Sequence, residues 1–132
     1  MIRFAQILSA IFVLVLGASA LTTIFSPMSI NEPSGFNAAT NYGITNLRTL
    51  GAPTLSLAVI TAIGALKKKW LLILPASLYF LFNASARLIS VFIEGYEPIM
   101  LRGLILTITL FILSQVSLQI FRRVEKFQSI KN

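Results

Sequence analysis

The sequence contains no cysteine, no histidine and no aspartate, and its four acidic residues are all glutamate. Protein zinc sites use Cys, His and carboxylate ligands, and haem takes His, Cys, Met or Tyr as its axial ligand. Thiol redox chemistry needs paired cysteines, and Ser-His-Asp or Cys-His catalysis needs a histidine base. We therefore expect no catalytic residues, no metal ligands and no cofactor. These absences favour a protein that is not an enzyme.

Charge is also scarce. Charged residues make up 11% of the chain and hydrophobic residues 56%, whereas a soluble domain carries about 25% charged residues. The eleven Lys and Arg residues lie between and beside apolar runs rather than on one polar face, which argues against nucleic-acid binding. The first apolar run holds no acidic residue, so a small proton-coupled exporter, which needs a membrane-embedded acid, is also disfavoured.

Long apolar runs, in contrast, occur four times. A helix of about 20 residues spans the roughly 30 Å hydrocarbon layer, and each run is long enough to cross it. We predict an all-α fold, a four-helix transmembrane bundle that forms a single integral membrane domain over residues 1–132. The predicted helices cover about 4–25, 47–66, 70–93 and 101–121, with an outer loop over 26–46.

The first run also has the features of a signal peptide. Arg3 supplies a basic start, an apolar stretch follows, and Ala18-Ser19-Ala20 matches a cleavage site. The apolar run continues through Phe25, however. This continuation favours a retained transmembrane helix over a cleaved leader.

The connections between the runs indicate how the helices are arranged. The turn 67–69 and the connection 94–98 are short, so we predict an antiparallel up-down topology. The loop 26–46 is rich in Asn, Gly and Pro, and is either an ordered cap or a mobile loop with one short helix within 36–44. Pro53 and Pro75 are expected to kink or start helices.

The basic residues orient this bundle in the membrane. Eight of them fall on one side of the predicted helices: Arg3, Lys67, Lys68, Lys69, Arg122, Arg123, Lys126 and Lys131. Short cytoplasmic loops carry an excess of Lys and Arg. We therefore predict that both termini and the lysine turn lie in the cytoplasm.

Pairs of small residues four positions apart suggest where helices approach closely. Ala58 and Ala62 form one pair, and Gly103 and Thr107 form another. In lipid such pairs allow backbones to touch and gain dispersion contacts. Packing within the bundle is favoured over a dimer contact.

One polar face interrupts the third run. Asn83, Arg87 and Glu94 are spaced so that they share a face of the helix, and Arg48 and Arg102 open the second and fourth helices at the same outer level. These five residues are our candidate polar site.

Three interpretations of the site remain open. In the first, Arg87 snorkels to the outer headgroups or pairs with Glu94 and only stabilises the bundle. In the second, the arginines converge with Asn83, Asn46 and Tyr42 on a pocket for an anionic headgroup or a quinone-like ring, because a guanidinium offers a planar fork of donors. In the third, a partner protein supplies the counter-charge. We expect the guanidinium to point into the bundle or toward the outer surface rather than toward the lipid tails, and to lie near Glu94, Glu97 or a polar group of the second helix such as Thr49.

Two stretches carry a resemblance to a known family. They are "NLRTLGAPTLSLAVITAIG", residues 46–64, and "ARLISVFIEGYEP", residues 86–98. With Arg48 and Gly51 in the first, and Arg87 and Glu94-Gly95 in the second, the chain resembles bacterial membrane proteins of domain-of-unknown-function family 4345, of the DoxX-like kind. The family often has Asp where this chain has Glu94. The resemblance covers roughly residues 1 to 122 and implies a multi-pass protein of the bacterial inner membrane, without an established activity.

The sequence supports two functional hypotheses. The leading one is a non-enzymatic small membrane protein that acts as an accessory or scaffold subunit of a membrane complex. The alternative is a binding or transport protein for an anionic lipid or a quinone-like molecule at an outer-leaflet arginine cluster. The expected partners are the lipid bilayer, other membrane proteins and, in the alternative, that lipid or quinone.

Overall fold

The computed structural model describes residues 1–95 and 97–131, with side chains through residue 127, and the elements in this part of the chain are helices. Four helical spans are long and apolar enough to cross a membrane, which is typical of a small integral membrane protein and confirms the all-α prediction. They are α1 (Ile2–Phe25), α3 (Asn41–Thr49) with α4 (Gly51–Lys67), α5 (Trp70–Ile93) and α6 (Pro98–Lys131), and the short α2 (Pro27–Asn31) follows α1.

Several helices extend beyond the apolar runs that predicted them. The second span begins in the predicted loop at Asn41, and α6 starts at Pro98 and continues past Phe121 to Lys131. An apolar run indicates only the part of a helix that lies in the hydrocarbon layer. Gln, Glu, Lys and Arg are good helix formers in water, so the helix continues where the apolar run has ended.

The break between α3 and α4 has a local cause. Pro53 lacks a backbone N–H, so the carbonyl of Thr49 receives no helical hydrogen bond from it. Leu50, between the two helices, nevertheless keeps helical dihedral angles, with φ −65° and ψ −23°. The two helices therefore form one span with an interruption rather than a turn.

A tight turn joins α4 to α5. Lys68 adopts the left-handed conformation with φ 56°, and the backbone N–H groups of Lys68 and Lys69 both donate to the carbonyl of Gly64. Such bonds satisfy carbonyls that the end of a helix leaves free. Gly64 also permits the close approach of α5, because a methyl group there would lie 2.8 Å from Cβ of Leu72.

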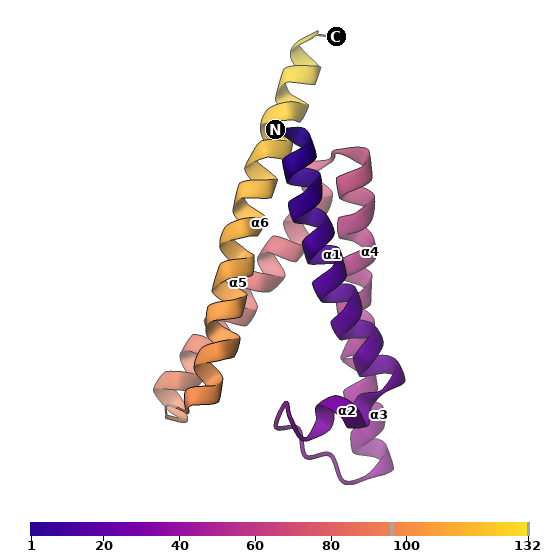
Figure 1. The fold of residues 1–132 in the computed structure, drawn as a ribbon, viewed down its shortest axis with the longest axis vertical. Helices are drawn as coiled ribbons and strands as arrows, with labels where there is room; N and C mark the ends of the chain where they lie inside the picture. Colours follow the sequence, from indigo (N-terminus) through magenta and orange to yellow (C-terminus); the bar gives the residue numbers. More distant parts are fainter. Residues whose placement is uncertain (96, 132) are drawn as a thin grey trace.

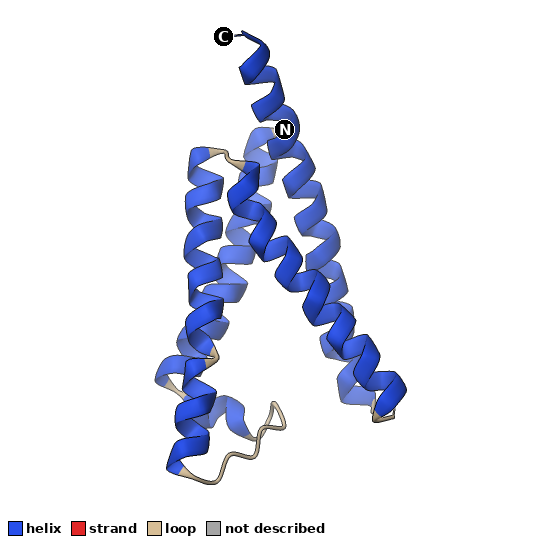
Figure 2. Ribbon diagram, turned by 180° about the vertical axis from the view of Figure 1, so that it is seen from behind, coloured by secondary structure: helices blue, strands red, loops and turns tan. Residues whose placement is uncertain are grey.

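The helices alternate in direction and form two pairs, α1 with α4 and α5 with α6 (Figure 1). Both chain termini and the α4–α5 turn lie at one end of the bundle, which we call the termini end. The helices α2 and α3, the loop between them and the α5–α6 connection lie at the other, which we call the cap end. The two pairs pack together toward the termini end and splay apart toward the cap end (Figure 2).

The main core lies where the two pairs meet. Phe12 and Phe80 are 0% and 2% exposed, and their rings meet edge to face with centroids 5.8 Å apart. Leu8, Leu16 and Leu110 pack in the same cluster. Edge-to-face aromatic pairs add to the free energy of burial, so this contact joins α1 to α5 near the middle of the membrane-spanning length.

The segment between α1 and α3 is an ordered cap held by one asparagine. Asn31 is 8% exposed, its amide nitrogen donates to the carbonyl of Ala38, and its side-chain oxygen accepts from the N–H of Ala38 at 2.8 Å. The hydroxyl of Thr40 accepts from the N–H of Gly43 and caps α3. The sequence left open an ordered cap or a mobile loop, and in the structure the segment folds back on itself through these bonds. It contains α2 and α3 rather than one short helix within 36–44.

Candidate functional site

A cavity of about 690 Å³ lies at the cap end between α1, the cap and α5. Ligand pockets commonly have volumes of about 300 to 1,000 Å³, so this space suits a small molecule or a lipid headgroup. Its described lining comes from α1, α2, α3, α4, α5 and the loop between α2 and α3, and includes no residue of α6. The cavity therefore occupies the splayed part of the bundle.

Arg87 of α5 lines this cavity, and its orientation depends on two neighbours. Its Nε donates to Oδ1 of Asn83, one helical turn earlier, at 2.9 Å. On the other side the guanidinium lies against α6, because a methyl group at Gly103 would collide with Nη1 and lie 2.9 Å from Cζ. Asn83 and Gly103 together fix where the positive charge sits.

Hydroxyl groups on α1 and α4 contribute much of the remaining polar lining. Thr22, Thr23 and Thr54 each donate their proton to a carbonyl four residues earlier, so only their oxygen lone pairs face outward. Ser19 of α1 also lines the cavity, and its hydroxyl has no hydrogen-bond partner among the described residues.

Two further hydroxyls with no described hydrogen-bond partner come from other segments. Ser34 belongs to the loop between α2 and α3, and Tyr79 belongs to α5, one turn before Asn83. The rest of the described lining is apolar and consists of Ala18, Ile30, Phe36, Leu47, Leu50 and Pro53. The cavity thus combines a polar, donor-bearing part with an apolar part.

The structure brings together only two residues of the candidate polar site. Asn83 and Arg87 are hydrogen-bonded to each other and line the cavity. Arg48 on α3, Glu94 at the end of α5 and Arg102 on α6 are exposed, as Arg87 is, and lie outside the described lining. The spacing of the five residues along the chain does not by itself bring them to one cavity.

The expected neighbours of Arg87 need correction. Among the described residues its hydrogen-bond partner is Asn83, and it forms no ion pair with Glu94 or Glu97 and no bond with Thr49. Glu94 follows Arg87 by nearly two turns and caps the end of α5, so reaching it would require both side chains to extend along the axis. Asn83 is one turn away on the same face and needs no such extension.

The cavity residues that the sequence analysis missed include three on α1. Ser19, Thr22 and Thr23 are spaced by three and one, so they share a face of the helix. This spacing was visible in the sequence, but the same stretch also resembles a cleavage site. Ser34 had no such signal, because only the fold of the cap brings it to the cavity.

A second polar cluster, also missed, is built around four fully buried serines and lies nearer the termini end. Ser9 of α1 and Ser117 of α6 share a hydrogen bond of 2.9 Å, and Ser117 also bonds the carbonyl of Ala5 at 3.1 Å. Ser77 of α5 accepts from Ser114 of α6 at 2.9 Å and from Gln115 at 2.7 Å. We call these residues the serine cluster.

The serine cluster has a structural explanation. Hydrogen bonds between helices in a membrane stabilise their association, and buried hydroxyls with partners carry no unmet desolvation cost. The cluster connects α6 to both α1 and α5. It holds no unsatisfied group that would indicate a ligand.

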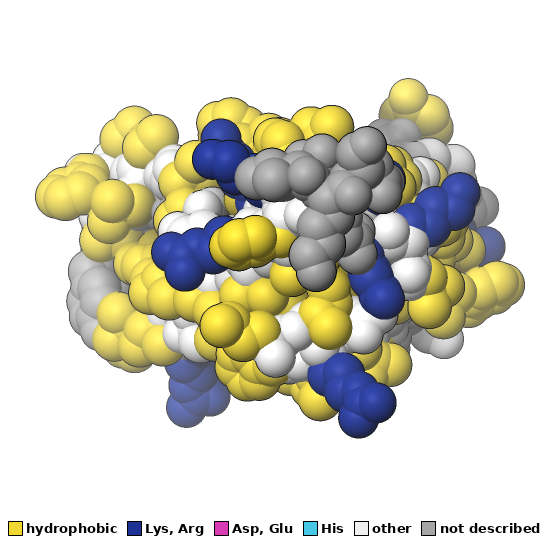
Figure 3. Space-filling view, turned by 90° about the horizontal axis from the view of Figure 1, so that it is seen from above, with side chains coloured by type: hydrophobic (Ala, Val, Ile, Leu, Met, Phe, Trp, Pro, Cys, Tyr) yellow, Lys and Arg dark blue, Asp and Glu magenta, His cyan; other side chains and the backbone are white. Residues whose placement is uncertain are grey.

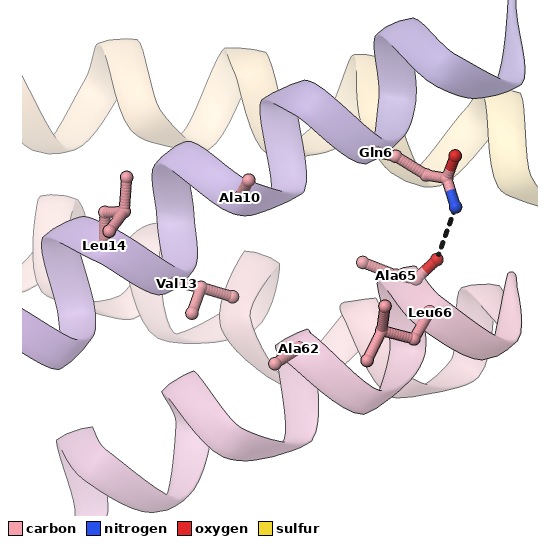
Figure 4. A pocket seen from close by; sticks show the side chains of 7 residues that line it. All are labelled: Gln6, Ala10, Val13, Leu14, Ala62, Ala65 and Leu66. Atoms are coloured by element: carbon pink, nitrogen blue, oxygen red, sulfur yellow. Dashed lines mark hydrogen bonds between the residues drawn. The ribbon is translucent and has the colours of Figure 1, made fainter.

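A separate groove of about 360 Å³ lies on the surface between α1 and α4 (Figure 4). Small side chains of Ala10, Ala62 and Ala65 leave it open, and Gln6 at one end donates to the carbonyl of Ala65 at 3.2 Å. Ala58, the other half of the predicted small-residue pair, is instead buried, and Gly17 of α1 faces it. One member of that pair thus packs inside the bundle while the other lines a surface groove.

The termini end is densely bonded and basic. Arg122 of α6 lies over the ring of Trp70 at 5.4 Å from its centroid, and Lys69 forms an ion pair with Glu125 at 2.6 Å. Figure 3 looks down on this end and shows Lys and Arg side chains around its rim. The described residues contain no group of His, Cys, Asp or Glu that could hold a metal ion.

No family model, no curated protein and no solved structure matches this chain. The resemblance to family 4345 therefore stays a prediction from the two short stretches that carry it.

Proposed function

We propose that this small membrane protein binds an amphipathic molecule in the cap-end cavity. The observation that supports this most is the cavity itself, which has the volume of a ligand pocket and combines an apolar part with unpaired polar groups around Arg87. Binding requires none of the absent residue types. It agrees with the expectation that the protein is not an enzyme.

The splay of the helices supports a ligand that enters from the membrane. Several lining residues, among them Ala18, Ser19 and Arg87, are exposed, so the cavity is open on one side. Large apolar side chains cover the outside of the spans, as in Leu14 of α1 and Phe82 of α5, which are 70% and 65% exposed. A molecule dissolved in the bilayer can therefore reach the cavity without crossing water.

A pair of matched substitutions tests this proposal. Ser19→Leu places a large side chain in the cavity, whereas Ser56→Leu makes the same change at an exposed position of α4 outside the described lining. Native mass spectrometry of the protein purified in mild detergent should find a retained small molecule in the parent and in Ser56→Leu, but not in Ser19→Leu. Equal retention in all three proteins would contradict the proposal.

We also propose that the termini end faces the cytoplasm of a bacterium and that the protein lies in the inner membrane. The support is the positive-inside rule, applied to the basic residues at that end. Because the chain has no cysteine, Lys68→Cys and Glu32→Cys each give a single thiol. A membrane-impermeant maleimide added to intact cells should label Glu32→Cys and leave Lys68→Cys unlabelled, and the reverse pattern would overturn this orientation.

The second candidate function is the accessory or scaffold role. The groove between α1 and α4 favours it, because small residues on two membrane-spanning helices let a further helix approach closely (Figure 4). The occupant we propose is a transmembrane helix of a partner protein, since the groove is apolar and faces the lipid. Ala62→Leu should release that partner during purification, whereas Val59→Leu, on an exposed face outside the described groove, should retain it. Loss of only a bound lipid from Ala62→Leu would contradict this role.

A further inference from the structure

The polar part of the cap-end cavity offers several hydrogen-bond donors beside the acceptor oxygens of Thr22, Thr23 and Thr54. The hydroxyls of Ser19, Ser34 and Tyr79 have no hydrogen-bond partner among the described residues, so each can donate. Asn83 uses its side-chain oxygen to accept from Arg87, which leaves its NH₂ group as a donor. A ligand therefore meets hydrogen-bond donors from α1, the cap loop and α5, as well as acceptors.

The charge of the cavity favours an anionic ligand. Arg87 is its one charged side chain among the described lining residues, and the lining includes no carboxylate. Only Nε of the guanidinium has a hydrogen-bond partner, so the N–H groups on Nη1 and Nη2 remain available. A guanidinium that has free donors and forms no ion pair among the described residues can bind oxyanions, and charge-assisted hydrogen bonds are the stronger kind.

We propose that the ligand of this cavity is an anionic amphiphile with a phosphate-based headgroup. This inference rests on the proposed function and specifies the chemistry of the molecule bound. The available donors come from α1, the cap loop and α5, so they approach from more than one side. A tetrahedral phosphate group offers oxygens in several directions, whereas a neutral quinone offers two carbonyl oxygens in one plane.

The apolar part of the cavity determines where the tail lies. Leu47, Leu50 and Pro53 form a wall on the α3–α4 side, and Ala18 adds apolar surface on α1. The side without described α6 residues leaves a path for an acyl chain into the surrounding lipid. The headgroup would then contact the polar part of the lining at Arg87, and the tail would contact the apolar part.

Gly103 acts in this arrangement as a positioning residue. It makes room for the guanidinium, and any side chain in its place would push Arg87 away from α6. The charge would remain, but its distance from Ser19 and Ser34 would change. Gly103→Ala therefore keeps the positive charge of Arg87 but moves the guanidinium, so it tests whether the position of the charge matters.

The test uses the full chain in a mild non-ionic detergent and native mass spectrometry to measure bound molecules. The probes are dioctanoyl phosphatidylglycerol, which is anionic, dioctanoyl phosphatidylcholine, which is zwitterionic, and inorganic phosphate. Both lipids carry the phosphodiester, so they differ in net charge: we expect the parent to bind the phosphatidylglycerol about tenfold more tightly, because the choline cation of the phosphatidylcholine is repelled by Arg87. Inorganic phosphate should bind more weakly than either lipid, because it lacks the tail.

Variants assign this preference to the cavity. Arg87→Gln and Gly103→Ala should each lose most of the preference for phosphatidylglycerol, whereas Arg102→Gln removes an exposed arginine outside the described lining and should keep it. Should Arg87→Gln not fold, Gly103→Ala and Arg87→Lys provide the same comparison with the charge retained. A thermal unfolding curve for each variant establishes that the protein is folded.

The outcomes distinguish this inference from the proposed function. Equal binding of the two lipids, abolished by Ser19→Leu, overturns the anionic headgroup and leaves cavity binding intact. Binding that Ser19→Leu does not change overturns both. Inorganic phosphate that binds as tightly as phosphatidylglycerol overturns the amphiphile, since the tail would then contribute nothing.

Discussion

The two ends of the bundle use polar residues in opposite ways. At the termini end and in the serine cluster most of them bond to one another, as in Ser9 with Ser117 and Lys69 with Glu125, although Oε2 of Glu125 is buried without a partner among the described residues. At the cap end Arg87 has only Asn83 as a partner, and the hydroxyl of Ser19 has none among the described residues. Polar groups in a membrane protein are expensive unless they are satisfied. Polar side chains that bond to one another hold helices together, whereas polar side chains without a partner are available to a ligand.

The largest effect is expected at the contact that joins the two helix pairs. Phe12→Ala removes a fully buried ring from its edge-to-face partner Phe80, and we expect it to lower the free energy of unfolding by about 3–5 kcal/mol. Phe92→Ala, at a side chain that is 81% exposed near the cap end, is the matched control and should change it by less than about 0.5 kcal/mol. Equilibrium unfolding in detergent gives both values, and similar losses would show that the contact does not join the pairs.

Arg87→Leu should separate stability from binding. An arginine at the centre of a membrane helix costs about 2.5–3.5 kcal/mol on insertion scales, and less near the surface. The variant should therefore insert as well as the parent or better, with a gain below that range, and still lose the bound molecule. An insertion assay and native mass spectrometry measure the two effects. Poorer insertion together with unchanged binding would mean that Arg87 only anchors the helix.

A substitution in the serine cluster should lower stability, whereas Arg87→Leu should lower ligand binding. Ser117→Val adds a methyl group at a side chain that is 0% exposed and removes its bonds to Ser9 and Ala5. Overpacking of this kind costs about 1–3 kcal/mol. Ser34→Val in the cap should leave stability unchanged and weaken ligand binding instead. A thermal unfolding midpoint that falls equally in both variants would remove the distinction between the two ends.

The smallest effect is expected at the ion pair of the termini end. Lys69 and Glu125 are 56% and 28% exposed, and exposed ion pairs contribute about 0.2–1 kcal/mol. A double-mutant cycle with Lys69→Ala and Glu125→Ala should give a coupling energy in that range, which decreases as salt is added. A larger coupling that does not respond to salt would mean that the pair is shielded from water.

The sequence could predict the spans but not their angle. Apolar runs reveal where lipid requires a helix, and the lysine turn reveals that α4 and α5 are neighbours. The splay depends on which faces of the two helix pairs meet, as at Phe12 of α1 and Phe80 of α5, whose ring centroids are 5.8 Å apart. Such contacts join residues far apart in the chain, and no local pattern contains them.

For the candidate site, too, the sequence predicts contacts within one helix but not contacts between helices. Helical spacing placed Asn83 and Arg87 together because both lie on one helix, one turn apart. It could not reveal that Gly103 of α6 lies behind the guanidinium, or that Arg48 and Glu94 face elsewhere. Those relations depend on the rotation of one helix against another.

The splay gives the molecule a different footprint in each leaflet of a bilayer. A bundle that is narrow at the termini end and wide at the cap end displaces unequal areas of lipid on the two sides (Figures 1 and 2). Lateral pressure in the leaflet around the cap end acts on the walls of the cavity. The same pressure in the opposite leaflet meets helices that are already in contact through Ser9 and Ser117. We therefore expect the composition of the leaflet around the cap end to change the width of the cavity more than that of the opposite leaflet.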